Sequence, residues 1–336
     1  MKYNYLIFIG RFQPFHIGHE KVIKTALSLA SKVIVLVGSA HQARSFRNPW
    51  NFKERESFIR ANFSTIENEN ILTFPLLDYL YNEDLWIQTV KEILLGVADY
   101  NSNTNLKIGL IGHQKDESSY YLSRFPEWER EECENFNNIS STNIRELFFS
   151  NKETTNSLSD KVMKKLNIFK MQDEYITMQN EFAFIKKYHN EWPLIFNTVS
   201  ALVIQSGHIL LIRKRTEPGL GLFSLPCRRI HNKEKLLDVA IKKLREEASI
   251  KLSESVLLEN ITRTEVFDNP YSWRGSTITH TFLIELDCDK FSTITSPFFA
   301  FFSTWVPLSK VNPEMMFEDH YQIIQTLTAK NLKGFL

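Results

Sequence analysis

The sequence has few cysteines, almost no net charge and no long apolar run. Its widely spaced cysteines show no metal-ligand clustering, which favours reduced thiols; they are Cys133, Cys227 and Cys288. A formal net charge of +1 offers no basic surface for nucleic acid or an acidic membrane. No apolar stretch approaches the roughly 20 residues of a membrane span, and Met1 leads directly into a strand pattern, with no signal peptide. We therefore expect a cytoplasmic protein that binds neither nucleic acid nor membrane.

The chain is long enough for more than one domain, because 336 residues exceed what one hydrophobic core usually supports. Apolar strand patterns alternate with segments whose apolar residues recur at helical spacing. The strands are expected at 5–10, 33–38, 71–76 and 107–112, and the helices at 18–31, 52–62 and 84–97. This alternation, without an internal repeat, predicts a Rossmann-like α/β domain with a parallel sheet.

The most informative segment is GRFQPFHIGH at 10–19, because it lies between the first strand and the first helix. Ligands of open α/β sheets bind beyond the carboxyl ends of the strands, where a helix start offers N–H groups to an anion. His16 and His19 can donate hydrogen bonds to phosphoryl oxygens. The segment also supplies three candidate phosphate-binding residues, Gly10, Arg11 and Gly18. Histidines at this spacing are also typical of a capped helix with no ligand.

A second phosphate-binding pattern lies at 139–145, ISSTNIR. Ser141 and Thr142 mark a helix start whose first N–H groups can bind phosphate. Arg145, one turn further on, adds a forked and permanently charged donor. The pattern alone would suit an ordinary helix cap with a solvated arginine, but together with 10–19 it favours a nucleotide triphosphate site.

The two motifs resemble the H-x-G-H nucleotidylyltransferase superfamily, and the first domain resembles the archaeal-type nicotinamide mononucleotide (NMN) adenylyltransferases. The further segments that carry this resemblance are Gly38-Ser39-Ala40, Asn48-Pro49, Glu54-Arg55 and Asp78 with Asn82 and Trp86. The resemblance implies that Asn82 and Trp86 contact the nicotinamide ring. Trp86 equally suits an anchor in the apolar face of its helix.

The resemblance implies that the NMN phosphate attacks the α-phosphorus of ATP, giving NAD and pyrophosphate. His16 and His19 would hold the ATP phosphates, and Arg145 with the helix start at Ser141 and Thr142 would hold the leaving pyrophosphate. Mg²⁺ is expected to arrive with ATP, bound mainly by phosphates and water. An H-x-G-H enzyme with another phosphate acceptor is the main competing interpretation.

A second domain is expected to begin at 193, after a linker helix at 171–192 and a first domain at 1–170. Strands at 196–204 and 209–213, joined by a short hairpin, precede a helix at 236–248. Residues 228–250 resemble the box of the Nudix hydrolases, which implies an α/β/α Nudix fold with a mixed sheet. In this register Glu234, Glu246 and Glu247 occupy three acidic positions of the Mg²⁺ or Mn²⁺ site.

The box departs from the Nudix pattern at four positions. Arg228 and Ser249 replace glycines, Lys242 replaces the arginine, and Lys243 replaces a glutamate. An ammonium group beside the carboxylates repels a divalent metal that must activate the attacking water. We therefore predict weak or absent hydrolysis of ADP-ribose. The alternatives are a bifunctional enzyme that also cleaves ADP-ribose to AMP and ribose 5-phosphate, and a noncatalytic ligand-binding or dimerisation module, so a homo-oligomer is left open.

Overall fold

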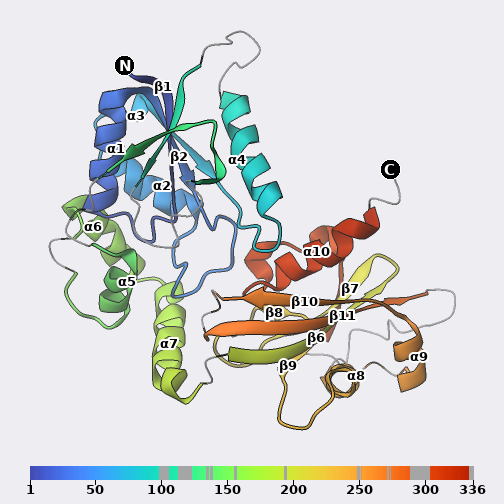
Figure 1. The fold of residues 1–336 in the computed structure, drawn as a ribbon. Coiled ribbons are helices and arrows are strands. Elements are labelled where there is room, and N and C mark those ends of the chain that lie inside the picture. Colours follow the sequence, from blue (N-terminus) through green and yellow to red (C-terminus); the bar gives the residue numbers. More distant parts are fainter. Residues whose placement is uncertain are drawn as a thin grey trace. The chain divides into compact units, whose positions relative to one another are not determined.

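The chain divides into two compact units in the computed structural model, unit 1 over Met1–Phe182 and unit 2 over Ala183–Leu336 (Figure 1). The structure describes residues 1–97, 106–112, 123–133, 136, 139–154, 157–192, 195–247, 250, 252–270, 272, 274–287 and 303–332. Each unit has its own sheet, and each is described by itself below.

The sheet of unit 1 has the strand order β3-β2-β1-β4-β5. Its strands are β1 (Tyr3–Gly10), β2 (Ala30–Val37), β3 (Ile71–Pro75), β4 (Ile108–Gly112) and β5 (Glu129–Glu132). All four neighbouring pairs are parallel. The order reverses at β1 and β4, and such a reversal is where doubly wound sheets bind their ligands.

Helices cover both faces of this sheet (Figure 1). The helices before residue 170 are α1 (Ile17–Leu29), α2 (Phe52–Ala61), α3 (Thr65–Glu69), α4 (Glu83–Val97), α5 (Ser141–Phe149) and α6 (Asp160–Phe169). They are followed by α7 (Asp173–Tyr188), which continues past the end of unit 1 at Phe182. Leu6 and Phe8 of β1 belong to the core that contains α1, α2, α5 and α6, whereas Ile7 and Ile9 belong to the core beneath α4. Alternate side chains of one strand therefore fill two separate cores.

Unit 2 has a mixed sheet of order β10-β11-β6-β7-β12, with β8 paired to β7 and β9 paired to β6. Its strands are β6 (Ile195–Gln205), β7 (His208–Arg213), β8 (Phe223–Ser224), β9 (Cys227–Arg229), β10 (Ile261–Asn269), β11 (Ser276–Leu286) and β12 (Ser303–Pro307). The β6 and β11 strands are parallel, and the other pairs are antiparallel. The β6 to β7 hairpin turns at Ser206 and Gly207, both with positive φ, as two-residue hairpin turns require.

The helices of unit 2 are α8 (Leu236–Glu247), α9 (Glu254–Glu259) and α10 (His320–Leu332), with short 3₁₀ turns at His189–Glu191, Leu308–Lys310 and Pro313–Met315. The α10 helix lies on the opposite side of the sheet from α8 and α9 (Figure 1). Ile241 and Leu244 of α8 pack with β6 and β7. The fold class expected from the sequence, a Rossmann-like domain followed by a mixed α/β/α domain, is confirmed.

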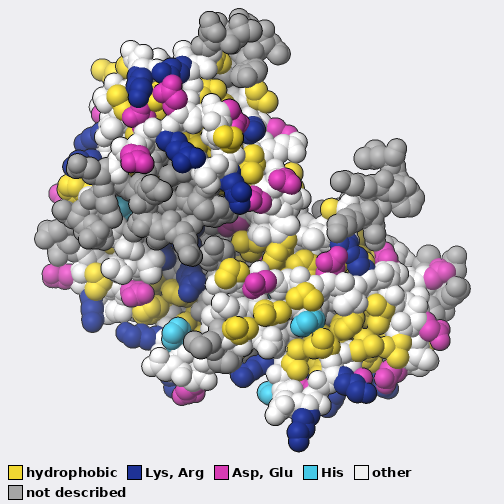
Figure 2. Space-filling view, viewed as in Figure 1, with side chains coloured by type: hydrophobic (Ala, Val, Ile, Leu, Met, Phe, Trp, Pro, Cys, Tyr) yellow, Lys and Arg dark blue, Asp and Glu magenta, His cyan; other side chains and the backbone are white. Residues whose placement is uncertain are grey.

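The surface carries charges of both signs. On the face shown in Figure 2, Lys and Arg side chains are interspersed with Asp and Glu, in keeping with the formal net charge of +1. Within the described residues, no helix has the length and apolar character needed to cross a membrane.

Candidate functional site

The loop after β1 and the first turn of α5 meet beside the point where the sheet reverses its strand order. Ser141 Oγ donates to the carbonyl of Pro14 at 3.2 Å. Arg145 Nη1 donates to the carbonyl of Gln13 at 2.6 Å. The two motifs predicted to bind phosphate, more than a hundred residues apart in the sequence, therefore lie together in the structure.

His16 and His19 cap the α1 helix reciprocally. His16 Nδ1 accepts the N–H of His19, and His19 Nδ1 accepts the N–H of His16, both at 3.3 Å. The two rings are stacked with centroids 3.6 Å apart. Because each Nδ1 is an acceptor, the hydrogen of a neutral ring sits on Nε2. The helix cap thus fixes the tautomer in which Nε2–H is the donor, which is the form suited to phosphoryl oxygens.

The two glycines of the first motif make room for ring side chains. A Cβ on Gly18 would lie 3.1 Å from the His16 ring, and a Cβ on Gly10 would lie 2.9 Å from the Phe12 ring. Phe12 in turn packs edge-on against His19, with centroids 4.9 Å apart. Gly18 therefore leaves room for the His16 ring, and Gly10 leaves room for the Phe12 ring that packs against His19.

Arg145 is a buried cation at this junction, only 4% exposed. Besides Gln13 it donates to Thr142 Oγ1 at 3.2 Å, and its buried Nε has no hydrogen-bond partner among the described residues. Burial, followed by the charges of Arg11 and Arg47, lowers the pKa of Arg145 to about 9. A guanidinium held among other cations stabilises an anion that comes within reach.

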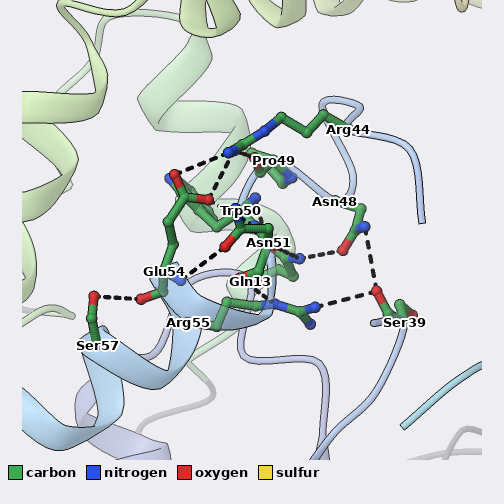
Figure 3. Close-up of polar contacts among 10 residues, drawn as sticks. All are labelled: Gln13, Ser39, Arg44, Asn48, Pro49, Trp50, Asn51, Glu54, Arg55 and Ser57. Carbon is green, nitrogen blue, oxygen red and sulfur yellow. Dashed lines mark hydrogen bonds and ion pairs between the residues drawn. The ribbon is translucent and has the colours of Figure 1, made fainter. Parts of the chain in front are cut away.

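Arg55 is a second buried cation, and four of its five N–H groups donate to backbone carbonyls. Its Nη1 donates to Arg11 O at 2.7 Å and to Gly38 O at 2.6 Å, and Nη2 donates to Ser39 O at 3.2 Å. Nε donates to Asn51 O at 3.3 Å. Its exposed fraction is 0%, and burial lowers the pKa of Arg55 to about 10. The contact with Ser39 is visible in Figure 3.

The start of α2 places Arg55 by a capping box. Asn51 Oδ1 accepts the N–H of Glu54 at 3.0 Å, and the Glu54 carboxylate accepts the N–H of Asn51 at 2.8 Å (Figure 3). Arg44 holds the same carboxylate through two bonds of 2.9 and 3.1 Å and also donates to Pro49 O at 2.6 Å. The first turn of α2 is therefore fixed before Arg55 turns toward the sheet.

Asn82 and Trp86 lie at the start of α4. Asn82 Oδ1 caps the helix by accepting the N–H of Leu85 at 3.0 Å. Trp86 is half-buried and packs against Phe125, with ring centroids 6.0 Å apart. Asp78, which precedes this segment, accepts the N–H and Oγ–H of Ser39 at 3.1 and 2.7 Å. The loops after β2 and β3 are therefore joined at the sheet edge that carries the phosphate motifs.

In unit 2, Glu234, at the position of the first glutamate of the Nudix-like box, forms an ion pair with Arg228. Arg228 stands where the box has a glycine. Arg228 Nη2 lies 2.6 Å from Glu234 Oε1, and Nη1 lies 3.1 Å from Oε2. The N–H of His231 donates to the same carboxylate at 2.8 Å. The hydrogen bond from Arg228, then that from His231, lowers the pKa of Glu234 to about 2. Both carboxylate oxygens are thus used by the protein.

The remaining box residues do not compensate. Glu246 Oε1 lies 3.8 Å from Lys242 Nζ on the surface of α8. Burial lowers the pKa of Lys214, and the nearby charge of Lys243 lowers it further. The side chain of Glu247 and residue Ser249 lie outside the described residues. Within the described part of the chain, no group of three His, Cys, Asp or Glu residues could hold a metal ion. The residues that are described do not fit a Nudix metal centre.

Two family models match the chain. A cytidylyltransferase-like model matches residues 7–147, and a NUDIX domain model matches residues 195–327. The protein is therefore a cytidylyltransferase-like domain followed by a NUDIX domain.

Individual relatives narrow this assignment. A nicotinamide/nicotinic acid mononucleotide adenylyltransferase of Acinetobacter baylyi is 37% identical over 182 residues, which cover 54% of this chain and 94% of the relative. A nicotinamide-nucleotide adenylyltransferase of Aeropyrum pernix is 32% identical over 147 residues, or 43% of this chain and 79% of the relative. A solved structure of a bifunctional NMN adenylyltransferase/ADP ribose pyrophosphatase from Francisella tularensis, complexed with AMP and a Mn ion, is 30% identical with a TM-score of 0.89, covering 98% of this chain and 99% of that one. The chain belongs to the bifunctional NMN adenylyltransferase/Nudix hydrolase family.

Sequence reasoning missed two contributors to the site. Gln13 is 1% exposed; its Nε2 donates to Asn48 Oδ1 and to Trp50 O, and its Oε1 accepts the N–H of Trp50 (Figure 3). Arg55 entered the sequence analysis only within a family-like pair, without a role. A charged residue four positions after a capping asparagine gives no sign of the direction in which its side chain points, so the sequence alone could not assign a role to Arg55.

Proposed function

We propose that unit 1 is an NMN adenylyltransferase that makes NAD and pyrophosphate from NMN and ATP. The observation that carries the proposal is the junction of the two phosphate motifs, where Arg145 and Ser141 bond to the loop that leads into His16 and His19. The family assignment supports NMN as the acceptor.

In the proposed reaction a phosphate oxygen of NMN attacks the α-phosphorus of ATP, and the bond from that phosphorus to the pyrophosphate oxygen breaks. His16 and His19 donate Nε2–H hydrogen bonds to the phosphates. Arg145 and the start of α5, at Ser141 and Thr142, receive the charge of the leaving pyrophosphate. No covalent intermediate on the protein is required, so catalysis is positioning plus charge stabilisation. Gly10, Arg11 and Gly18 belong to the same proposed ATP site.

Asn82 and Trp86 are proposed to bind the nicotinamide ring of NMN. Their position at the start of α4, next to the loop joined by Asp78 and Ser39, supports this. Asn82 caps its helix through Oδ1, which leaves the amide Nδ2 as the group proposed to face the nicotinamide carboxamide. Nicotinate mononucleotide differs from NMN in that same group, so Asn82 is the proposed determinant between them.

Divalent metal in unit 1 is proposed to arrive as Mg²⁺ bound to ATP. In the described residues of the site the charged groups are mainly arginines, with Asp78 engaged by Ser39 and Gln42. The substrate phosphates and water would therefore carry the ion.

We further propose that unit 2 hydrolyses ADP-ribose weakly or not at all, and therefore that Mg²⁺ or Mn²⁺ is not held at its box. The Arg228 to Glu234 ion pair supports this, because it occupies a carboxylate that the metal would need. The alternative is a bifunctional enzyme, as the name of the Francisella relative describes that protein.

The experiment that tests both proposals is one incubation series with purified protein and Mg²⁺. ATP with NMN, and ADP-ribose alone, are followed by chromatography for NAD and AMP. NAD without AMP is the expected result. AMP from ADP-ribose at an ordinary enzymatic rate would support the bifunctional alternative, and absence of NAD would refute the assigned acceptor.

A further inference from the structure

Two residues at the carboxyl edge of the unit 1 sheet have left-handed backbones although neither is glycine. Phe12 has a φ of 52° and Ser39 has a φ of 50°. They follow the ends of β1 and β2, whose last residues pair in register, Gly10 with Val37. Non-glycine residues with positive φ are strained and persist only where the surroundings hold them. Something must therefore hold both loops in this form.

Arg55 contacts the backbone of both loops. It donates to the carbonyl of Arg11, which directly precedes Phe12, and to the carbonyls of Gly38 and Ser39. A single planar group thus bonds three carbonyls from two loops at the strand ends. The contact with Ser39 is drawn in Figure 3. Lysine could not reproduce this arrangement, since an ammonium group is a point donor without the fixed fork of a guanidinium.

The charge of Arg55 is not neutralised by a contacting carboxylate. In the part of the chain that the structure describes, Arg55 forms no ion pair; the charges that act on it without contact are those of Asp78, Arg11 and Glu54, in that order. A buried cation of this kind is ordinarily paired, because leaving it unpaired is costly. An anion bound at the same sheet edge would relieve this cost. The carbonyl oxygens of Arg11, Gly38 and Ser39 would repel such an anion if they faced it. Arg55 binds these three oxygens and so keeps them turned toward its own guanidinium group.

We infer that Arg55 is a positioning residue for the triphosphate of ATP: it holds the loops after β1 and β2 in their left-handed form, with their carbonyls turned away from the phosphates. This inference rests on the proposed function of unit 1. Four of the five N–H groups of Arg55 are engaged by the backbone, so it acts on the phosphates mainly through the loops and through its charge.

The test compares Arg55→Lys with Arg60→Lys. Arg60 lies on the same helix, is partly exposed and bonds Glu56 and Thr73, so its replacement is a matched control for loss of an arginine from α2. The first measurement is steady-state NAD synthesis. For Arg55→Lys the KM for ATP should rise about tenfold or more, because small misplacements of phosphate-binding groups are expensive. The KM for NMN and both constants of Arg60→Lys should change much less.

The second measurement is calorimetric binding of ATP and of adenosine in the absence of NMN. Arg55→Lys should weaken ATP binding and leave adenosine binding unchanged, which a purely structural role would not produce. Thermal unfolding of each variant identifies material that fails to fold, and if Arg55→Lys is unfolded, Arg55→Gln at low temperature replaces it in the same titrations. Equal ATP affinity in the folded Arg55 variant (Arg55→Lys, or Arg55→Gln in its place) and in wild-type protein overturns the inference. Wild-type protein that makes no NAD would instead overturn the proposed function.

Discussion

Arg228 and Glu234 face each other in a two-bonded ion pair six residues apart, with Nη2 to Oε1 at 2.6 Å and Nη1 to Oε2 at 3.1 Å. In the register expected from the sequence, Arg228 stands at the position of a Nudix glycine and Glu234 at the position of the first box glutamate. The arginine therefore adds a cation and engages both oxygens of this carboxylate. In the same register, Lys243 replaces a further glutamate of the box.

Restoring one position of the box should not restore hydrolysis. We expect Lys243→Glu alone to release no AMP from ADP-ribose with Mn²⁺, because Arg228 still occupies Glu234. A variant that combines Arg228→Gly, Lys242→Arg, Lys243→Glu and Ser249→Gly should release AMP, and adding Glu246→Gln to it should abolish the gain. Chromatography of AMP measures all three. Activity in Lys243→Glu alone would show that the ion pair does not block the site.

Replacing Arg145 by lysine should damage chemistry more than folding. A lysine keeps the charge but cannot donate to Gln13 O and Thr142 Oγ1 from one planar group. We expect kcat for NAD synthesis to fall by about 10²-fold or more, the usual effect of losing one transition-state donor. Arg130→Lys, on the exposed side of β5, is the control and should be near wild type. An unchanged kcat in Arg145→Lys would remove this residue from the proposed site.

Asn82 can be tested without losing its helix cap. Asn82→Asp keeps an oxygen that accepts the N–H of Leu85, whereas Asn82→Ala loses it, at a typical cost of about 1 kcal/mol in unfolding free energy. If Asn82 binds the nicotinamide amide, both variants should raise the KM for NMN, but only Asn82→Ala should lower the melting temperature. If the cap is its whole role, Asn82→Asp should behave as wild type in both measurements.

Because His320 is buried and uncharged, we expect the stability of unit 2 to fall in acid. Its Nδ1 accepts the N–H of Leu225 at 2.9 Å, and burial lowers its pKa from 6.5 to about 3 despite the nearby Glu318. The unfolded chain takes up a proton near pH 6.5 that the folded chain refuses until about pH 3, so stability is lost as the pH falls through that window.

The expected loss from His320 is up to about 1.4 kcal/mol of unfolding free energy per pH unit below 6.5. His320→Asn offers Oδ1 nearly where Nδ1 lies and cannot take up the proton, so its denaturation midpoint should depend less on pH. His208→Asn, on β7, is the control. Identical pH slopes for wild type and His320→Asn in urea titrations between pH 5 and 7 would contradict the prediction.

The arrangement of unit 1 could be predicted from sequence because its signals are local and periodic. The first strand and helix were expected at 5–10 and 18–31 and lie at Tyr3–Gly10 and Ile17–Leu29. The strand Glu129–Glu132 was not expected, since its four residues are charged and carry no apolar alternation; it forms because β4 offers it a parallel edge. Pairing with a neighbour, and not composition, makes this segment a strand.

The candidate site could be predicted only in part for a related reason. The motifs at 10–19 and 139–145 predict from the sequence alone which groups bind phosphate. That the two motifs contact each other, through Gln13 and Pro14, depends on the path of the chain. The role of Arg55 depends on which side of α2 faces the sheet. In unit 2, the sequence showed that Arg228 departs from the Nudix pattern, and only the structure showed that it binds Glu234.

The contacts of Glu181 bear on where this protein can be cut. This carboxylate, 4% exposed, accepts the N–H of Phe46 at 2.8 Å, and Phe182 beside it packs against the Phe46 ring. Tyr175 and Met178, earlier on α7, belong to the core of unit 1. An expression fragment of the adenylyltransferase that stopped at residue 170 would leave this aromatic core open to water, whereas one that continued through α7 to residue 188 would keep it closed.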